Sequence, residues 1–185
     1  MIFFGALLLC MFLAVIAQHF IGPLPVIHAR VLLMPIVIFY GSLAMPLWGM
    51  LAITFTGGLL WDAMNTQFTD GGVEISAGWS IVLFAALGAI MSGFRPLFQR
   101  GRWEIHCLLT GFCTSALVLA EYLMITIRRQ PVQFIFNEQV WWRIGGAGLA
   151  AAFLAPLAFF FFNYIALLTG YDPQPVRGVL GKRPA

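Results

Sequence analysis

The chain has 185 residues, of which 61% are hydrophobic and only 9% are charged. A soluble globular domain carries about 25% charged residues, so this composition excludes a soluble protein and predicts an integral membrane protein. The formal net charge is +3, but the basic residues lie in short segments between apolar runs. That distribution is typical of membrane topology and argues against a nucleic-acid-binding surface.

Apolar runs divide the first 170 residues into six expected transmembrane helices, which a chain of this length can pack into one bundle. We interpret the first run as a retained span, because it lacks a basic leader and is too long for a signal-peptide core. Pro35 is expected to interrupt the second run, and Pro156 to kink the sixth. The expected spans are residues 2–20, 31–43, 47–63, 78–94, 105–127 and 141–169.

The sixth run opens at Trp141 and Trp142, an aromatic pair suited to the membrane interface. Its Phe159–Phe162 stretch is expected to face lipid. Residues 171–185 are polar and rich in Pro and Gly, so we expect them to form a disordered tail. The fold class is therefore all-α, with a helical bundle over residues 1–170 and a tail over 171–185.

Counts of Lys and Arg predict the orientation of the chain in the membrane. With six spans, both termini share one side with the loop over residues 95–104. That side carries six basic residues and the opposite side four, which predicts cytoplasmic termini and places the acidic 64–77 loop outside. The six are Arg95, Arg100, Arg102, Arg177, Lys182 and Arg183, and the four are Arg30, Arg128, Arg129 and Arg143.

Two carboxylates lie within or at the edge of the expected spans. Asp62 ends the third run shortly after Gly57 and Gly58, and Glu121 lies in the fifth run. A charged group in hydrocarbon is costly unless it is paired or hydrated, so we expect both acids to turn inward. The two runs end at the same membrane face, and the glycine pair lets another backbone approach where Asp62 lies.

Two interpretations of these acids stay open. They form either a structural charge pair that fixes the register of the helices, or a polar site for a ligand, a proton or a partner's side chain. The basic residues expected at the same face are Arg128, Arg129 and Arg143.

Small residues recur every fourth position in two of the runs, a spacing that lets membrane helices approach closely. We therefore expect the third to sixth runs to pack against one another. The rows are Ala85, Ala89 and Gly93 in the fourth run, and Ala147, Ala151 and Ala155 in the sixth.

No catalytic constellation is evident, so the sequence predicts a protein that is not an enzyme. Gly78-Trp79-Ser80 lacks the second glycine and the facing histidine that a serine nucleophile in a membrane would need. His19 and His28 have no further ligand nearby with metal-binding spacing, and no phosphate-binding loop is present. We expect neither a metal nor a cofactor.

The order of these parts resembles the rod shape-determining protein MreD family of bacterial cell elongation. The resemblance is carried by the Leu24-Pro25 break, a second span headed by Arg30, a third span ending Gly58-Leu59-Leu60-Trp61-Asp62 and a fourth span led by Gly78. The chain departs from the family pattern after Asp62, where a longer loop over residues 65–77 replaces a short turn.

The resemblance implies a non-catalytic scaffold in the bacterial inner membrane. Its partners would be an MreC-like single-span protein and membrane lipid, together with the actin-like MreB, a RodA-type glycan polymerase and a penicillin-binding transpeptidase. The family fold is similar to the membrane substrate-binding subunits of energy-coupling-factor transporters. That similarity supplies the alternative function, a vitamin-type transport subunit with a small-molecule pocket among the third to sixth spans.

Overall fold

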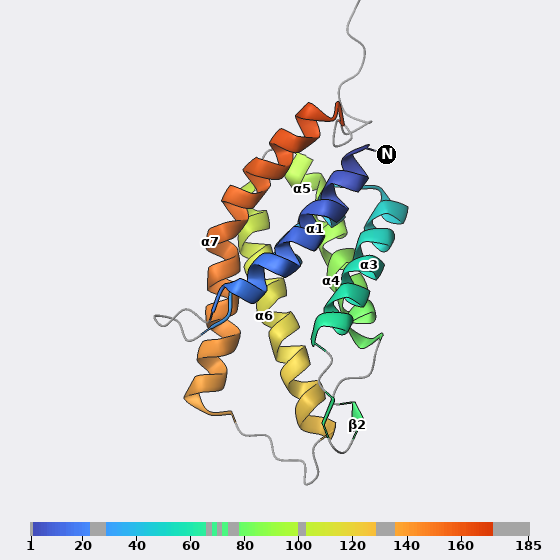
Figure 1. The fold of residues 1–185 in the computed structure, drawn as a ribbon. Helices are drawn as coiled ribbons and strands as arrows, with labels where there is room; N and C mark the ends of the chain where they lie inside the picture. Colours follow the sequence, from blue (N-terminus) through green and yellow to red (C-terminus); the bar gives the residue numbers. More distant parts are fainter. Residues whose placement is uncertain are drawn as a thin grey trace, which may run out of the picture.

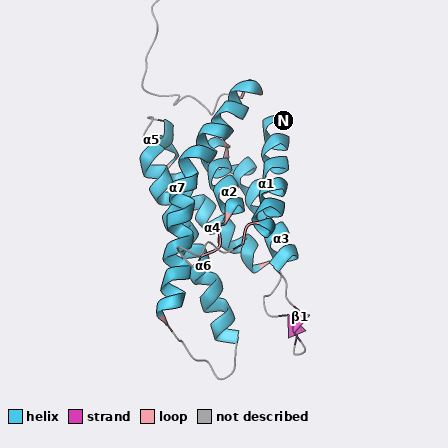
Figure 2. Cartoon of the chain, turned by 60° about the vertical axis from the view of Figure 1, so that its left-hand side comes forward, coloured by secondary structure: helices cyan, strands magenta, loops and turns pink. Residues whose placement is uncertain are grey.

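The computed structural model describes residues 2–22, 29–65, 68–69, 72–73, 78–99, 103–128 and 136–171 (Figure 1). Helices dominate these residues, with one small antiparallel hairpin of two strands (Figure 2). The elements in chain order are α1 (Ile2–Phe20), α2 (Leu33–Ala44), α3 (Leu47–Asn65), β1 (Phe68–Thr69), β2 (Gly72–Val73), α4 (Trp79–Gly93), α5 (Arg95–Gln99), α6 (Trp103–Arg128) and α7 (Glu138–Leu168).

The fold is that of a helical membrane protein. Four helices, namely α1, α3, α6 and α7, are long and apolar enough to cross a membrane. The other two apolar helices are shorter, with 12 residues in α2 and 15 in α4. The six expected runs therefore correspond to six apolar helices, but two of them do not reach the length of an ordinary span.

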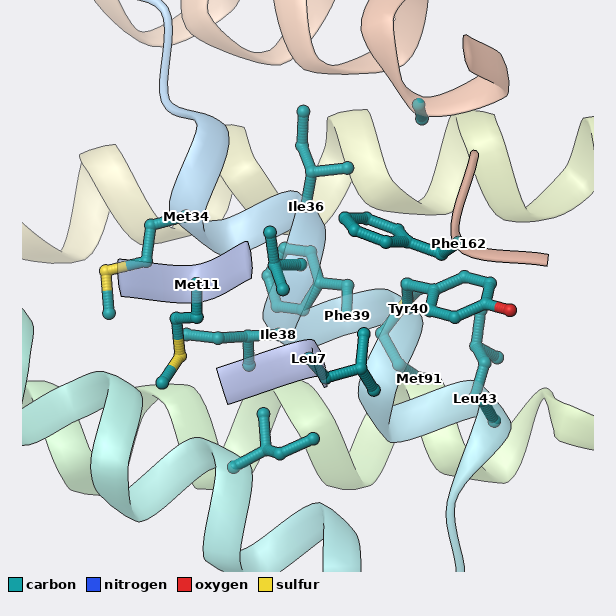
Figure 3. Packing of buried hydrophobic residues seen from close by; sticks show 14 of the residues in the cluster. Leu7, Met11, Met34, Ile36, Ile38, Phe39, Tyr40, Leu43, Met91 and Phe162 are labelled. Carbon is teal, nitrogen blue, oxygen red and sulfur yellow. The ribbon is translucent and has the colours of Figure 1, made fainter. Parts of the chain in front are cut away.

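The core is built around α2, which is buried from Met34 to Ala44. It packs against α1, α3, α4 and α7. Side chains of α1, α4 and α7 lie beside it in Figure 3, among them Leu7, Met91 and Phe162. The rings of Phe39 and Tyr40 have no exposed surface. Pro35 does not interrupt the helix as predicted, because it lies in the first turn, where a missing N–H costs no hydrogen bond.

The remaining helices form two closely packed pairs, α3 with α4 and α6 with α7. Glycine makes the second contact possible, since a Cβ added at Gly111 would come within 2.7 Å of the Gly148 carbonyl oxygen. The Ser115 hydroxyl donates to the Ile144 carbonyl across the same contact, at 3.1 Å. The small row on α7 lies in the interior, with Ala147, Ala151 and Ala155 all buried.

Tyr171 belongs to the bundle and not to the tail, contrary to the sequence prediction. Its ring stacks on Phe3 at 4.5 Å between centroids, and its hydroxyl donates to the Ala44 carbonyl at 3.1 Å. Arg95 Nη2 donates to the same carbonyl at 3.2 Å, at the start of the unpredicted helix α5. Burial raises the pKa of the Tyr171 phenol while Arg95 opposes the shift, so the hydroxyl stays a donor at neutral pH. Residues 172–185, the rest of the predicted tail, lie outside the described residues.

The four phenylalanines of α7 do not all face lipid as predicted. Phe159 and Phe162 are buried and pack on Tyr40, with ring centroids 5.4 and 5.1 Å away. Phe160 and Phe161 are exposed. Four consecutive residues cover a full turn of helix, so they cannot all share one face.

Candidate functional site

Asp62 holds the start of α4. Its carboxylate oxygen Oδ2 accepts the backbone N–H of Gly78 at 2.6 Å, and its side chain is only 8% exposed. Gly78 is the residue before α4 and has φ of +99°, a left-handed conformation that favours glycine. A carboxylate at this position also meets the positive end of the α4 dipole, which stabilises its negative charge.

Glu121 binds Trp61, the residue just before Asp62 on α3. The indole Nε1 of Trp61 donates to Glu121 Oε1 at 2.5 Å, which joins α3 to α6. Trp61 is the residue before Asp62, so this bond places the two acids at the same end of the contact between α3 and α6.

Trp61 is the site residue that sequence reasoning missed. Nothing in residue spacing pairs positions 60 residues apart, but one signal is present in the sequence. A tryptophan next to an inward-facing acid carries an N–H that needs an acceptor once the ring is buried. Trp61 is 5% exposed and packs edge-on against Phe84 of α4, so it links three helices.

Arg143 is exposed at the start of α7. The side chains of Arg128 and Arg129 lie outside the described part of the chain, so the predicted charge pairs with them are not described either. The contacts described around the acids are made by N–H donors of the backbone and of an indole. This arrangement favours the structural interpretation of the two acids, since both bonds fasten one helix to another.

The glycine pair before Asp62 admits neighbouring helices of the same chain. A Cβ added at Gly58 would lie 2.5 Å from the Ile81 Cα, so the backbone of α4 occupies that space. At Gly57 the added atom would meet the Ile38 side chain of α2 at 2.5 Å. The close approach predicted from the glycines is therefore present, and it belongs to the bundle itself.

The small row on α4 faces away from the bundle, contrary to the predicted packing. Ala89 and Gly93 are exposed, Ala85 is half-buried, and a Cβ added at Gly93 would meet nothing within 4 Å. The packed face of α4 instead carries Gly88, where an added Cβ would meet Thr54 at 2.8 Å.

An apolar groove with a volume of about 640 Å³ lies between α1 and α7, over α2. Small side chains such as Ala14, Val37 and Ala158 line it, and Leu157 and Phe161 are among the larger ones. This groove is bounded by α1, α2 and α7, so it is not the pocket among the third to sixth spans that the transport alternative predicts.

These features define a helical membrane protein in which two acids bind N–H donors of neighbouring elements. Within the described residues, no three His, Cys, Asp or Glu side chains are grouped to hold a metal ion. Comparison with protein-family models, with curated proteins and with solved structures finds no match to this chain.

Proposed function

We propose that this chain is a non-catalytic integral membrane scaffold of the bacterial cell-elongation complex. In this role it docks an MreC-like single-span partner and links the actin-like cytoskeleton to peptidoglycan synthesis. The proposal rests on the resemblance of the Leu24-Pro25 break, the Gly58 to Asp62 stretch and the Gly78-led helix to the MreD family. The exposed small row on α4 supplies the structural support.

The row on α4 is suited to receive another helix. Ala85, Ala89 and Gly93 are spaced by four residues, so they follow one face of the helix. Membrane helices associate through such faces, because small side chains let two backbones come close and gain van der Waals contact. Within the described residues no helix covers Gly93, which leaves the face open to a second chain.

In the proposed topology all six apolar helices cross the membrane. Since α2 and α4 are too short to span it alone, the helices around them line the rest of those two crossings. Both termini then lie in the cytoplasm of a bacterium and the bundle lies in its inner membrane. Asp62 and Glu121 lie toward the opposite, periplasmic face. In the scaffold their bonds to Gly78 and Trp61 keep α3, α4 and α6 in fixed positions, so that the α4 face is presented in one orientation.

The experiment tests whether the α4 face binds the partner. Gly93→Leu and Ala89→Leu enlarge the exposed row, and co-purification with an MreC-like single-span protein from detergent extracts is measured for each. We expect both variants to insert and fold but to lose most of the bound partner.

Gly5→Leu and Gly145→Leu are the matched controls. Both glycines are exposed on other helices, and an added Cβ meets nothing within 4 Å at either, as at Gly93. We expect both controls to bind as the unmodified chain does. Full binding by Gly93→Leu and Ala89→Leu, or equal loss in the controls, would contradict the proposed docking face.

A further inference from the structure

The apolar groove between α1 and α7 occupies only part of the bundle's height. The two helices come together at the end where Phe3 stacks on Tyr171. Below that contact the groove is lined on α7 from Leu154 to Tyr164 and on α1 from Cys10 to Ala17. Ten residues of helix rise about 15 Å, which is half of a hydrocarbon core of about 30 Å.

This length argues against a second transmembrane helix as the occupant of the groove. A spanning helix needs a contact surface through both leaflets, but the groove lining stops at Cys10 on α1 and Tyr164 on α7, and beyond it Phe3 stacks on Tyr171, just after α7. A single lipid acyl chain extends through one leaflet only. The length of the groove therefore matches a lipid of the leaflet away from the chain termini.

The open end of the groove has positive charge beside it. Ala17 and Leu33 are the lining residues nearest to the α1–α2 connection, and Arg30 lies three residues before Leu33. Arg30 is exposed, and an arginine side chain is long enough to lay its stem along an apolar surface while its guanidinium reaches the headgroup level. His19, also exposed, lies two residues beyond Ala17.

Negative charge is absent from the same part of the sequence. No Asp or Glu occurs before Asp62, so residues 1–61 carry only basic ionisable groups apart from Cys and Tyr. An arginine next to an apolar groove, with no acid on α1 or α2, complements a phosphate attached to an acyl chain.

We propose that this groove binds one acyl chain of an anionic phospholipid, whose phosphate is held at the open end by Arg30. The acyl chain by itself provides little selectivity, because it exchanges one apolar surrounding for another within the bilayer. The selectivity therefore comes from the headgroup. Lipid binding in the groove does not depend on whether a protein partner is bound to α4.

The test is native mass spectrometry of the full chain released from nanodiscs that contain equal amounts of phosphatidylglycerol and phosphatidylcholine. We expect one retained phosphatidylglycerol per chain, in several-fold excess over phosphatidylcholine. This arm needs no variant, so it remains informative if a substitution disturbs folding. Equal retention of the two lipids, or retention of neither, would overturn the proposal.

Variants locate the lipid within the structure. Arg30→Gln is expected to lower the preference for phosphatidylglycerol about fivefold, as is typical for one arginine near an anionic surface. Arg143→Gln removes an exposed arginine at the start of α7 and should leave the preference unchanged. Ala158→Phe places a large ring in the groove and should lower the retention of both lipids.

Three other outcomes count against the groove. Unchanged retention in Ala158→Phe would place the lipid elsewhere on the chain. An equal effect of Arg30→Gln and Arg143→Gln would mean that net charge, and not the groove, selects the lipid. A dimer mass lost only in Ala158→Phe would make a second copy of the chain the occupant.

Discussion

Substitution of Gly58 by alanine tests the closest helix contact of the candidate site. The added Cβ would lie 2.5 Å from Ile81 Cα and 2.6 Å from Ile81 N, so backbone atoms and not a flexible side chain stand in its way. Overpacking of this kind costs about 1–3 kcal/mol. Alanine is favoured over glycine within a helix by roughly 0.5–1 kcal/mol, which offsets part of that cost. We expect Gly58→Ala to lower the free energy of unfolding by up to about 2.5 kcal/mol, the overpacking cost less the helix preference.

The measurement is reversible unfolding in mixed micelles, followed by helical circular dichroism. Gly5→Ala is the control, because its added Cβ meets nothing within 4 Å and only the helix preference changes. The control should be as stable as the unmodified chain or slightly more so. If Gly58→Ala were as stable as Gly5→Ala, the backbones of α3 and α4 could not be in the contact described.

The remaining predictions concern the other bonds between helices, each measured by the same unfolding titration. Asp62→Ala removes the acceptor at the start of α4 and should cost about 0.5–2 kcal/mol, while Asp62→Asn keeps an acceptor and should lose less. Trp61→Phe removes one hydrogen bond from the half-buried Glu121, with an expected cost of about 1–3 kcal/mol. Trp48→Phe, at a position 82% exposed, should have almost no effect. Gly148→Leu places a side chain against Gly111 and should separate α6 from α7, seen as a loss of at least about 2 kcal/mol. If Trp61→Phe lowered the free energy of unfolding no more than Trp48→Phe does, the bond from the Trp61 indole to Glu121 would not stabilise the bundle.

Hydrophobic runs and turn residues are enough to predict most helix bounds of this chain. The first run, residues 2–20, coincides with α1, and the third begins at Leu47 as predicted. Pro and Gly break the chain where the helices end, because they remove backbone donors or admit conformations that helices do not use. The five-residue α5 carries no such signal, since one turn and a half of helix is too short to show a periodic pattern.

The direction in which each helix faces is harder to predict than its bounds. In a membrane, both the lipid-facing side and the packed side of a helix are apolar, so hydrophobic periodicity does not separate them. The two small rows show this, as Ala147, Ala151 and Ala155 are buried whereas Ala89 and Gly93 are exposed. The sequence pattern of the two rows is the same, and only the tertiary structure distinguishes them.

The inward orientation of the two acids could be predicted, because a buried polar group needs a hydrogen-bond partner. The expectation that Asp62 and Glu121 turn inward follows from the cost of charge in hydrocarbon; Asp62 is buried, and Glu121 is half-buried and bonded to α3. The donor to Asp62 could not be predicted, since a backbone N–H group leaves no trace in residue identity. The Gly78 N–H becomes available only because α4 begins at that point.

The central position of α2 bears on the order in which the protein assembles. Twelve residues of helix rise about 18 Å, well short of a bilayer core, so this segment alone is a poor substrate for insertion. Its longer neighbours α1 and α3 can enter the membrane as independent units, and α2 lies between them in the chain. We therefore expect α2 to move inward after its flanking helices are in the membrane, and to lose its contact with lipid when α7 packs against it.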